Sequence, residues 1–355
     1  MKRHDYLYIG DGFDNTVKTF DAESGRFLGR FVPSGDNDLN GPRGLIFDHN
    51  GNLLVTNQNV EPPPPPVPQN GSILKYDGHT GKFLGYLVSL NDPNAPFAPR
   101  GIILSKQNIL FVADVIVQSG LNGEVRTYDG TTGLFQGNLE HPPAVQFFPR
   151  SVVIGPDGLL YVSVSNNITT PEGQLGGRVV RYNPKTREFI DVFIEGDSNP
   201  DFNRPEGLVF GPNGNLYITS FRRDPNDTDK ILIFDRKGRF LDKIDLYAVG
   251  QPRAFAQAIL FGPNGKLFVP ITGPGPGNGQ PLGPDTGSVR RYNVKNKTFD
   301  VFVRPALLGG PLTEPWYLTF GKTDPATLAY GHDEEESSDH DHHHHHHHHN
   351  DESCD

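Results

Sequence analysis

A sixteen-residue pattern, seen as PRGLIFDHNGNLLVTN at 42–57, recurs along this chain of 355 residues and governs its architecture. Further copies occupy 99–114, 149–164, 205–220 and 256–271, and a partial sixth copy begins at Pro315 as PWYLTFG. The starts of successive copies are separated by 57, 50, 56, 51 and 59 residues. Self-similarity at this period is typical of repeat proteins, in which each repeat is one small supersecondary unit.

A second module follows each copy, as in NGSILKYDGHTGKFLGYLV at 70–88. It returns at 122–139, 176–194, 228–246 and 286–303, and its sixth example lies at the other end of the chain, at 14–32. Each repeat thus holds four short runs rich in β-branched and aromatic residues, separated by Gly, Asn, Asp and Pro. This pattern predicts four strands joined by tight turns.

Four strands of this length form a sheet that cannot bury both faces alone, so neighbouring sheets must stack face to face. Radial closure of the stack also protects the strand edges. The prediction is an all-β six-bladed β-propeller over residues 1–330, with four antiparallel strands in each blade. One register of the first strand holds Phe47, Leu104, Ile154, Phe210, Phe261 and Phe320, and one register of the second holds Leu53, Leu110, Leu160, Leu216 and Leu267.

The two ends of the chain are predicted to complete one blade together. Asp5–Gly10 matches the second-strand register, and Pro315–Phe320 matches the first strand. The N-terminus then supplies strands two to four of a blade whose first strand comes from the C-terminal side. The residual run Thr327–Tyr330 either pairs with Tyr6–Ile9 or leaves the fold.

Most of the formal net charge of −10 comes from the last 25 residues. Residues 331–355 contain nine of the 42 acidic residues and no Lys or Arg, which leaves 33 acidic against 32 basic residues in the body. A generally basic nucleic-acid binder is therefore excluded. No apolar stretch approaches the ~18 residues of a membrane helix, and Cys354 is the only cysteine, so no intrachain disulfide forms. We expect a monomer without nucleic-acid or membrane partners, cytoplasmic as the chain stands and secreted if a leader was removed.

The pattern P-x-G-φ-φ-φ-x-P-[ND]-G-x-L-[YF]-V, followed by G-x-V-x-[RK]-[YF]-[DN], resembles the NHL-repeat propellers over residues 5–320. It is most similar to the streptogramin-lyase-like branch and the gluconolactonase-like superfamily, which include lactonases, lyases and non-catalytic binding modules. The resemblance implies chemistry at the residue after the leading Pro of each first strand. Gluconolactonase-like proteins place metal-ligating Glu and Asn there, and streptogramin lyases place a catalytic His. This chain departs from both patterns, because it has one acidic residue there, Glu206, and no histidine.

The position after the leading residue, which is Pro in five copies and Ala256 in the other, forms a ring of six residues at the mouth of the predicted channel. They are Arg43, Arg100, Arg150, Glu206, Gln257 and Trp316. The long irregular loops that join second and third strands, at 58–70, 165–176, 221–228 and 270–287, open on the same face, where binding residues are typically found. Arginine presents a planar fork suited to carboxylate or phosphate, and tryptophan offers a stacking surface. We expect this ring to bind a small or extended anionic ligand, or a peptide; the alternative is an Arg–Glu network that fills the channel.

Two other classes of function remain open. The first is a lyase or hydrolase in which Glu206 or His141 acts as base and the arginines stabilise developing negative charge. A Ca²⁺ or similar ion near Glu206 would favour such an enzyme. No sequence motif for an organic cofactor is present. The second is a protein-interaction module with the Pro-rich run at 62–66 as its recognition element.

The C-terminal segment 331–355 contains ten of the fourteen histidines and, apart from Cys354, no apolar residue. We expect it to be a disordered acidic and histidine-rich tail. Imidazoles at this density bind Ni, Zn, Cu or Co ions. The candidate ligands are His340, His342, His343, His344, His345, His346, His347, His348 and His349. A purification tag is the alternative origin of the segment, although its interleaved acidic residues and trailing NDESCD are unusual for one.

If the tail binds metal independently of the propeller, the isolated peptide 331–355 binds Ni²⁺ or Zn²⁺ at neutral pH in a calorimetric titration. Its affinity falls below about pH 6, because protonated imidazoles no longer act as ligands. A peptide that fails to bind, together with a tailless body that binds, would move the metal site into the propeller.

Overall fold

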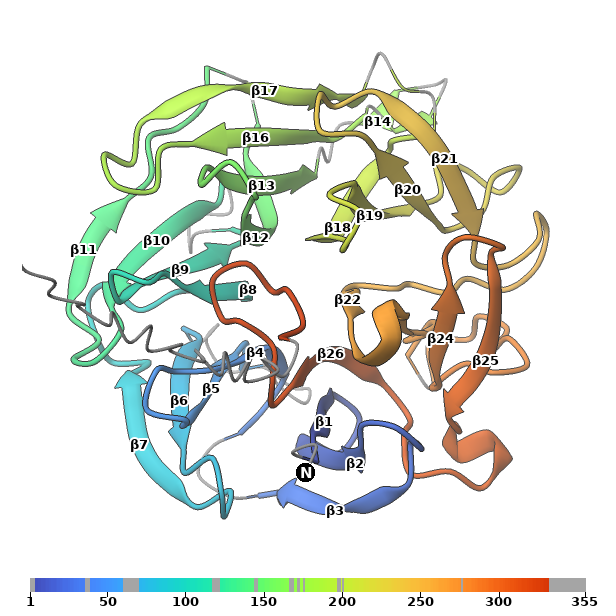
Figure 1. Cartoon of the computed structure of the whole chain (residues 1–355), viewed down its shortest axis with the longest axis horizontal. Coiled ribbons are helices and arrows are strands. Elements are labelled where there is room, and N and C mark those ends of the chain that lie inside the picture. Colours follow the sequence, from blue (N-terminus) through green and yellow to red (C-terminus); the bar gives the residue numbers. More distant parts are fainter. Residues whose placement is uncertain are drawn as a thin grey trace, which may run out of the picture.

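Six four-stranded antiparallel sheets stand side by side around a central axis in the computed structural model (Figure 1). The predicted six-bladed propeller with four strands per blade is confirmed. The structure describes residues 4–35, 39–59, 70–116, 122–143, 146–165, 169–170, 173–174, 176–196, 199, 201–275 and 277–331. Within these residues no helix is long and apolar enough to cross a membrane.

Each blade is given from its innermost strand outward. The first blade contains β4 (Pro42–Phe47), β5 (Leu53–Asn57), β6 (Ser72–Tyr76) and β7 (Phe83–Val88). The second contains β8 (Pro99–Leu104), β9 (Ile109–Asp114), β10 (Glu124–Asp129) and β11 (Phe135–Asn138). The third contains β12 (Phe148–Ile154), β13 (Leu160–Ser165), β16 (Arg178–Tyr182) and β17 (Phe189–Glu195), with the two-residue strands β14 (Thr169–Thr170) and β15 (Gly173–Gln174) in one of its loops.

The remaining blades follow the same order. The fourth contains β18 (Arg204–Phe210), β19 (Leu216–Phe221), β20 (Lys230–Phe234) and β21 (Phe240–Asp245). The fifth contains β22 (Leu260–Phe261), β23 (Leu267–Pro270), β24 (Val289–Asn293) and β25 (Thr298–Val303). The sixth contains β26 (Pro315–Phe320), β1 (Tyr6–Asp11), β2 (Thr16–Asp21) and β3 (Phe27–Val32). Two 3₁₀ turns, Pro263–Gly265 and Ala306–Leu308, lie in the connections.

The sixth blade joins the two ends of the chain. Strand β26 pairs antiparallel with β1, with Leu7 opposite Phe320 and Ile9 opposite Leu318. The predicted closure by both termini is confirmed. The predicted registers are also confirmed, because each first-strand residue lies opposite its second-strand partner. The pairs are Phe47–Leu53, Leu104–Leu110, Ile154–Leu160, Phe210–Leu216 and Phe261–Leu267.

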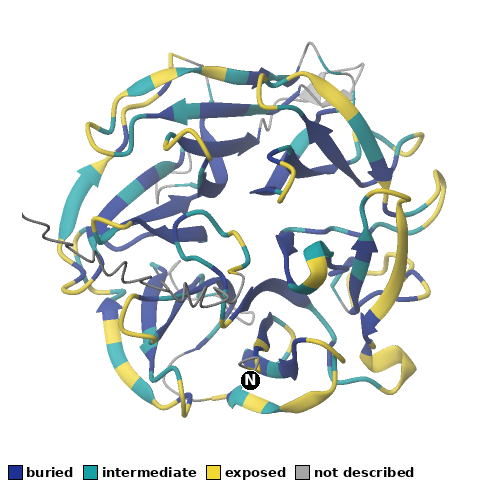
Figure 2. Cartoon of the chain, in the orientation of Figure 1, coloured by how far each residue is buried: buried dark blue, intermediate teal, exposed yellow. Residues whose placement is uncertain are grey.

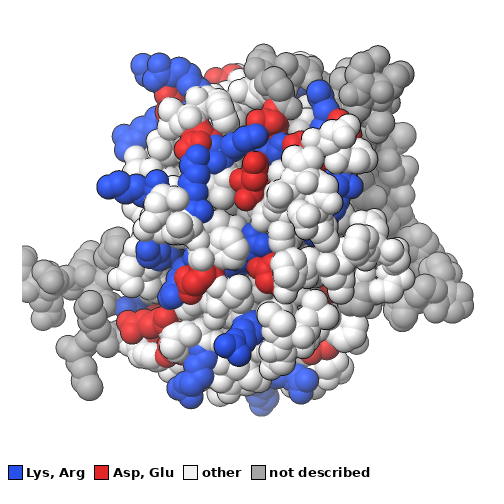
Figure 3. Space-filling view, turned by 90° about the vertical axis from the view of Figure 1, so that its right-hand side faces the viewer, with Lys and Arg blue, Asp and Glu red and all other residues white. Residues whose placement is uncertain are grey.

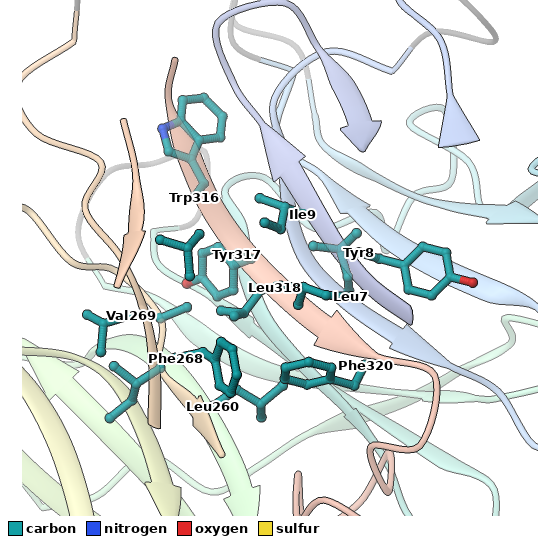
Figure 4. Close-up of a cluster of buried hydrophobic side chains, with 14 of the residues drawn as sticks. Leu7, Tyr8, Ile9, Leu260, Phe268, Val269, Trp316, Tyr317, Leu318 and Phe320 are labelled. Carbon is teal, nitrogen blue, oxygen red and sulfur yellow. The ribbon is translucent and has the colours of Figure 1, made fainter. Parts of the chain in front are cut away.

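The core lies between the blades rather than within any one of them. The inner strands are almost wholly buried, whereas the outermost strands alternate between exposed and covered residues (Figure 2). At the junction of the fifth and sixth blades, the rings of Phe268 and Phe320 meet edge to face with centroids 5.0 Å apart. Figure 4 shows Leu318 and Leu260 packed around this pair. Face-to-face burial of this kind supplies the hydrophobic stabilisation that a single sheet lacks.

Asp-based turns explain the repeated D-x-x-T-G sequences between third and fourth strands. The Asp77 carboxylate accepts hydrogen bonds from the backbone N–H groups of His79 and Thr80 and from the Thr80 hydroxyl. Asp129 and Thr132 repeat the arrangement in the next blade. These bonds to the charged form, that of the Thr80 hydroxyl first, lower the pKa of Asp77. Short turns on this face leave the long loops on the other.

The segment after β26 closes the far end of the channel, where it crosses the centre of Figure 1 in red. The carbonyl groups of Pro325 and Ala326 accept hydrogen bonds from the N–H groups of Leu104 and Ile154, at the ends of two first strands. Leu328 packs against four of the core clusters that the blades form between them. Thr327–Tyr330 neither pairs with Tyr6–Ile9 nor leaves the fold, so both alternatives expected for it were wrong. Tyr330 instead forms a β-bridge with Thr323 within the same segment. The apolar ends of the first strands hold this turn in the channel.

The shared blade makes the N-terminal strands essential. Deletion of residues 1–20 removes β1 and most of β2, which leaves β26 without a partner and exposes its buried face. We expect this deletion, and equally deletion of 312–330, to cause aggregation or loss of a single cooperative melting transition, measured by circular dichroism and size-exclusion chromatography. Deletion of 332–355 is the control and is expected to be harmless. A monomeric, cooperatively melting 21–355 protein would contradict the shared blade.

Candidate functional site at the arginine end of the channel

Five of the six ring residues lie at β-bulges in the first strands, whereas Gln257 lies before the start of β22. The pairing register shifts by one residue at Arg43, Arg100, Arg150, Glu206 and Trp316. A bulge sets two residues against one, interrupts the alternation of side chains and re-aims the extra residue. The ring side chains can therefore meet at the channel mouth while the rest of each first strand packs between blades.

Hydrogen bonds between blades fix the backbone of the ring. Hydroxyl groups on second strands, or just after one in the case of Thr272, donate to first-strand carbonyl groups of the next blade. The bonds run from Thr56 to Arg100 at 2.8 Å, from Ser163 to Glu206 at 2.6 Å and from Thr272 to Pro315 at 2.7 Å. Neighbouring first strands also approach closely, because a Cβ on Gly101 would lie 2.7 Å from the Cα of Ser151. Glycine at this position is required by the approach of the two backbones.

Arg43 is held by an aromatic ring and two amide groups. Its guanidinium carbon lies 3.4 Å from the centroid of the Trp316 ring. Its Nε donates to Gln58 Oε1 at 2.6 Å and its Nη1 donates to Gln257 Oε1 at 2.8 Å. The indole of Trp316 occupies space that only glycine leaves open, since a Cβ on Gly12 would lie 2.2 Å from it. This cation–π contact attracts the guanidinium without neutralising it.

The side-chain oxygen of Gln257 accepts hydrogen bonds from two arginines. Arg100 donates from Nη1 to the same Gln257 Oε1 at 2.6 Å, so a neutral amide oxygen lies between two positive charges. Burial lowers the pKa of Arg43, and the neighbouring Arg100 lowers it further. Burial also lowers the pKa of Arg100, with Arg150 as the next cause. Each guanidinium thus stands in a site that disfavours its charge.

Arg150 and Glu206 form the ion pair of the ring. The distance from Arg150 Nε to Glu206 Oε1 is 3.6 Å, which exceeds the length of an N–H···O hydrogen bond. Both side chains are buried, Glu206 to 1 % exposure. Arg150 Nε and Glu206 Oε2 have no hydrogen-bond partner among the described residues. Burying such groups without partners is costly unless something else satisfies them.

The sequence analysis missed two further residues of this site, Arg204 and Tyr317. Arg204 lies two residues before Glu206; its Nε also lacks a hydrogen-bond partner within the described part, and burial lowers its pKa. Tyr317 lies among Arg43, Arg100, Arg150 and Glu206, and burial raises the pKa of its phenol. The sequence did contain a signal that could have identified Tyr317. It occupies the column that the other blades fill with small residues, namely Gly44, Gly101, Ser151, Gly207 and Ala258.

The channel below the ring is nearly filled. The column of small residues, together with Tyr317 and Leu328, surrounds a space of only about 30 Å³. The channel therefore offers a ligand no route to the ring through the propeller.

His141 lies elsewhere. Its Nε2 is 2.9 Å from Glu124 Oε2, at the start of the third strand of the second blade, and its ring packs on Phe147. Glu206 lies on β18, the innermost strand of the fourth blade, so the structure does not bring His141 and Glu206 together.

In the described part of the chain, no group of three or more His, Cys, Asp or Glu side chains is arranged to hold a metal ion. Guanidinium groups surround Glu206 and repel a cation, so the residues present do not fit Ca²⁺ at this position. The tail histidines, His340 and His342–His349, and the Pro-rich run 62–66 lie outside the described residues.

Neither a protein-family model nor a curated protein matches this sequence. Among solved structures, a catalytically inactive form of virginiamycin B lyase from Staphylococcus aureus, with quinupristin, is similar over 90 % of this chain and 93 % of that chain, with a TM-score of 0.53 and 14 % identity. The chain shares the propeller fold of virginiamycin B lyase. The predicted resemblance to the streptogramin-lyase-like propellers is thereby confirmed for the fold.

Two other structures are similar at comparable identity. Hydrazine synthase from Kuenenia stuttgartiensis matches 75 % of this chain and 70 % of that chain, with a TM-score of 0.52 and 14 % identity. A gluconolactonase from Xanthomonas campestris matches 78 % of this chain and 77 % of that chain, with a TM-score of 0.49 and 12 % identity. Identities of this size establish the architecture alone.

Glu314 lies beside the ring, and its charge is disfavoured. Burial raises the pKa of this carboxyl above the ordinary value of 4.5, the nearby Asp11 raises it further, and Arg43 opposes both. An acid whose folded-state pKa is raised destabilises the fold when it is ionised. Stability should therefore rise as the pH falls through the folded pKa.

We expect Glu314→Gln, which keeps the shape and removes the charge, to raise the melting temperature at pH 7. The gain shrinks as the pH is lowered and vanishes below 4.5, where the carboxyl is protonated in both the folded and unfolded states. Glu188→Gln, at an exposed turn, is the matched control and should change little. A lower melting temperature for Glu314→Gln at pH 7 would show that the carboxylate is stabilising.

Proposed function

We propose that the arginine end of the channel binds a small ligand that carries a carboxylate or phosphate group. The observation that carries the proposal is a shortage of acceptors. Arg43 and Arg100 share one neutral amide oxygen, and Arg150 and Arg204 each keep a buried Nε without a hydrogen-bond partner among the described residues. A guanidinium has five N–H donors, and carboxylates and phosphates match its geometry.

The charge balance of the ring supports the same conclusion. Four arginines stand against two carboxyl groups, because Arg204 joins the three ring arginines and Glu314 lies near Arg43 in addition to Glu206. Burial disfavours the charge of Glu314, so positive charge remains in excess. Elsewhere on the molecule the charges are mixed: on the side seen in Figure 3, basic and acidic residues are interspersed. A negative ligand would relieve the repulsion within the ring, whereas a purely structural Arg–Glu network would be expected to pair its donors with acceptors.

A lyase or hydrolase remains the second candidate, and Glu206 favours it. Its Oε2 has no hydrogen-bond partner in the described part of the chain and lies beside the arginines. In such an enzyme Glu206 would accept a proton from the bound substrate while the guanidinium groups stabilise negative charge. Glu206→Gln would then abolish turnover and leave the affinity for the anion largely intact.

The binding proposal is tested by thermal unfolding in phosphate, sulfate or citrate against chloride at constant ionic strength. Ligands that bind only the folded state stabilise it by about 2.7 kcal/mol at a concentration 100-fold above Kd. For a domain of this size that corresponds to a rise of roughly 4 °C. We expect Arg100→Gln to abolish most of this rise and, without anion, to leave stability unchanged or higher, because Arg100 repels its neighbours.

Arg239→Gln is the matched control, since Arg239 is exposed and pairs with Asp235 in a distant turn. It should retain the full response to anions. If Arg100→Gln instead lowered stability without anion and kept the anion response, the ring would be structural and the binding proposal would fail.

A further inference from the structure

An apolar cavity of about 340 Å³ lies on the same face as the arginine ring. We call it the loop cavity; its walls include Phe13, Pro274, Leu282, Ala306, Leu307 and Leu312. Phe13 is in the turn between β1 and β2, Leu282 is in the loop between β23 and β24, and Leu307 is in the connection between β25 and β26. That connection leads directly into Pro315 and Trp316, so the cavity and the ring open on one side of the propeller.

The walls of the loop cavity leave large apolar side chains uncovered. Phe13, Leu282 and Leu307 are all exposed, the last to 57 %, whereas Leu312 is fully buried and forms the floor. Three loops thus bring apolar side chains to one place without covering them. Clustered exposure of this kind, unlike scattered surface leucines, is typical of binding sites.

The loop cavity adjoins the arginine ring through Gly12 and Trp316. Gly12 precedes Phe13 and is packed against the Trp316 indole, which also contacts the Arg43 guanidinium. Thr313, at the cavity wall, is two residues from Pro315. The indole and Gly12 therefore connect the apolar cavity to the buried cluster of positive charge.

We infer that the ligand of the arginine site is an amphipathic organic acid. Its anionic head contacts the arginines and its apolar body lies in the loop cavity. This inference rests on the proposed anion binding and names the class of ligand. Glu314 stands at the junction, against Gly275 and near Arg43, so an uncharged segment of the ligand belongs there and the head belongs beyond it, toward Arg100 and Arg150.

A second apolar cavity provides an internal contrast. It has a volume of about 400 Å³, lies on the opposite face beside the segment that closes the channel, and is lined by residues such as Phe210, Phe261 and Tyr330. Its lining contains no charged residue among those the structure describes. A ligand bound there would show no preference for a carboxylate over a neutral group of the same shape.

The test uses calorimetric titration of the full-length protein with butanoate, hexanoate and octanoate. Burial of each methylene strengthens binding by about fourfold, so octanoate is expected to bind at least tenfold more tightly than butanoate. Octanamide, which keeps the chain and loses the charge, is expected to bind at least tenfold more weakly than octanoate.

Two neighbouring leucines provide a matched pair of variants. Leu307 lines the loop cavity, whereas Leu308 is equally exposed, at 56 %, and is not part of its lining. The Phe13→Ser/Leu307→Ser double variant should reduce the ratio of octanoate to butanoate affinity by about tenfold. Leu308→Ser should leave that ratio as it is. Because all three side chains are exposed, folding of the variants is expected and is checked by their melting curves.

The outcomes separate this inference from the proposal beneath it. If butanoate and octanoate bound equally well and Arg100→Gln weakened both, anion binding would stand and the amphipathic ligand would be wrong. If no carboxylate bound, both would be wrong. If octanamide bound as tightly as octanoate and the Phe13→Ser/Leu307→Ser variant had no effect, the far-face cavity would be the apolar site and the inference would be overturned.

Discussion

The pairing of β26 with β1 brings together segments from opposite ends of the chain, and every other contact around the axis depends on it. Each blade buries its faces only against its two neighbours, so an open ring would leave two apolar sheet faces in water. Closing a loop that spans nearly the whole chain carries an entropic cost, which face-to-face burial across the last junction must offset. The Phe268–Phe320 contact belongs to that junction. Closure also sets the spacing of the first strands, and hence of the ring residues they carry.

The rigid ring of first strands explains how so much positive charge can be crowded together. An isolated pair of buried guanidinium groups would move apart or take up water, because desolvation of a charge costs several kcal/mol. Here the bulges, the hydroxyl-to-carbonyl bonds between blades and the indole of Trp316 hold the groups in place. The two nearby carboxyl groups, Glu206 and Glu314, leave part of the positive charge unbalanced. Local arrangements that lower the stability of the fold, such as this one, are typical of ligand-binding sites.

Much of the fold could be predicted because it is encoded in local periodicity. The opposition of Phe47 to Leu53 follows from alternation and a short turn, and it repeats in every copy. Membership of the arginine ring followed from the same alignment of copies. The contacts of the ring residues could not be predicted from that alignment, because Gln257 lies more than 150 residues from both arginines that donate to it. His141, attractive as a lone loop histidine, lies against Glu124 on a third strand, since position along a loop does not specify distance from the axis.

The sequence by itself determined the number of blades, their strand pairs, the shared blade and the six residues at the channel mouth, because each of these repeats at a regular interval. The tertiary structure alone decided that Tyr317 fills the channel, that Leu328 closes its far end and that Trp316 stacks on Arg43. It also decided that three loops form an apolar cavity beside the charges. These features are not repeated. Each depends on side chains from different blades meeting near one axis, and such meetings leave no periodic trace in a single sequence.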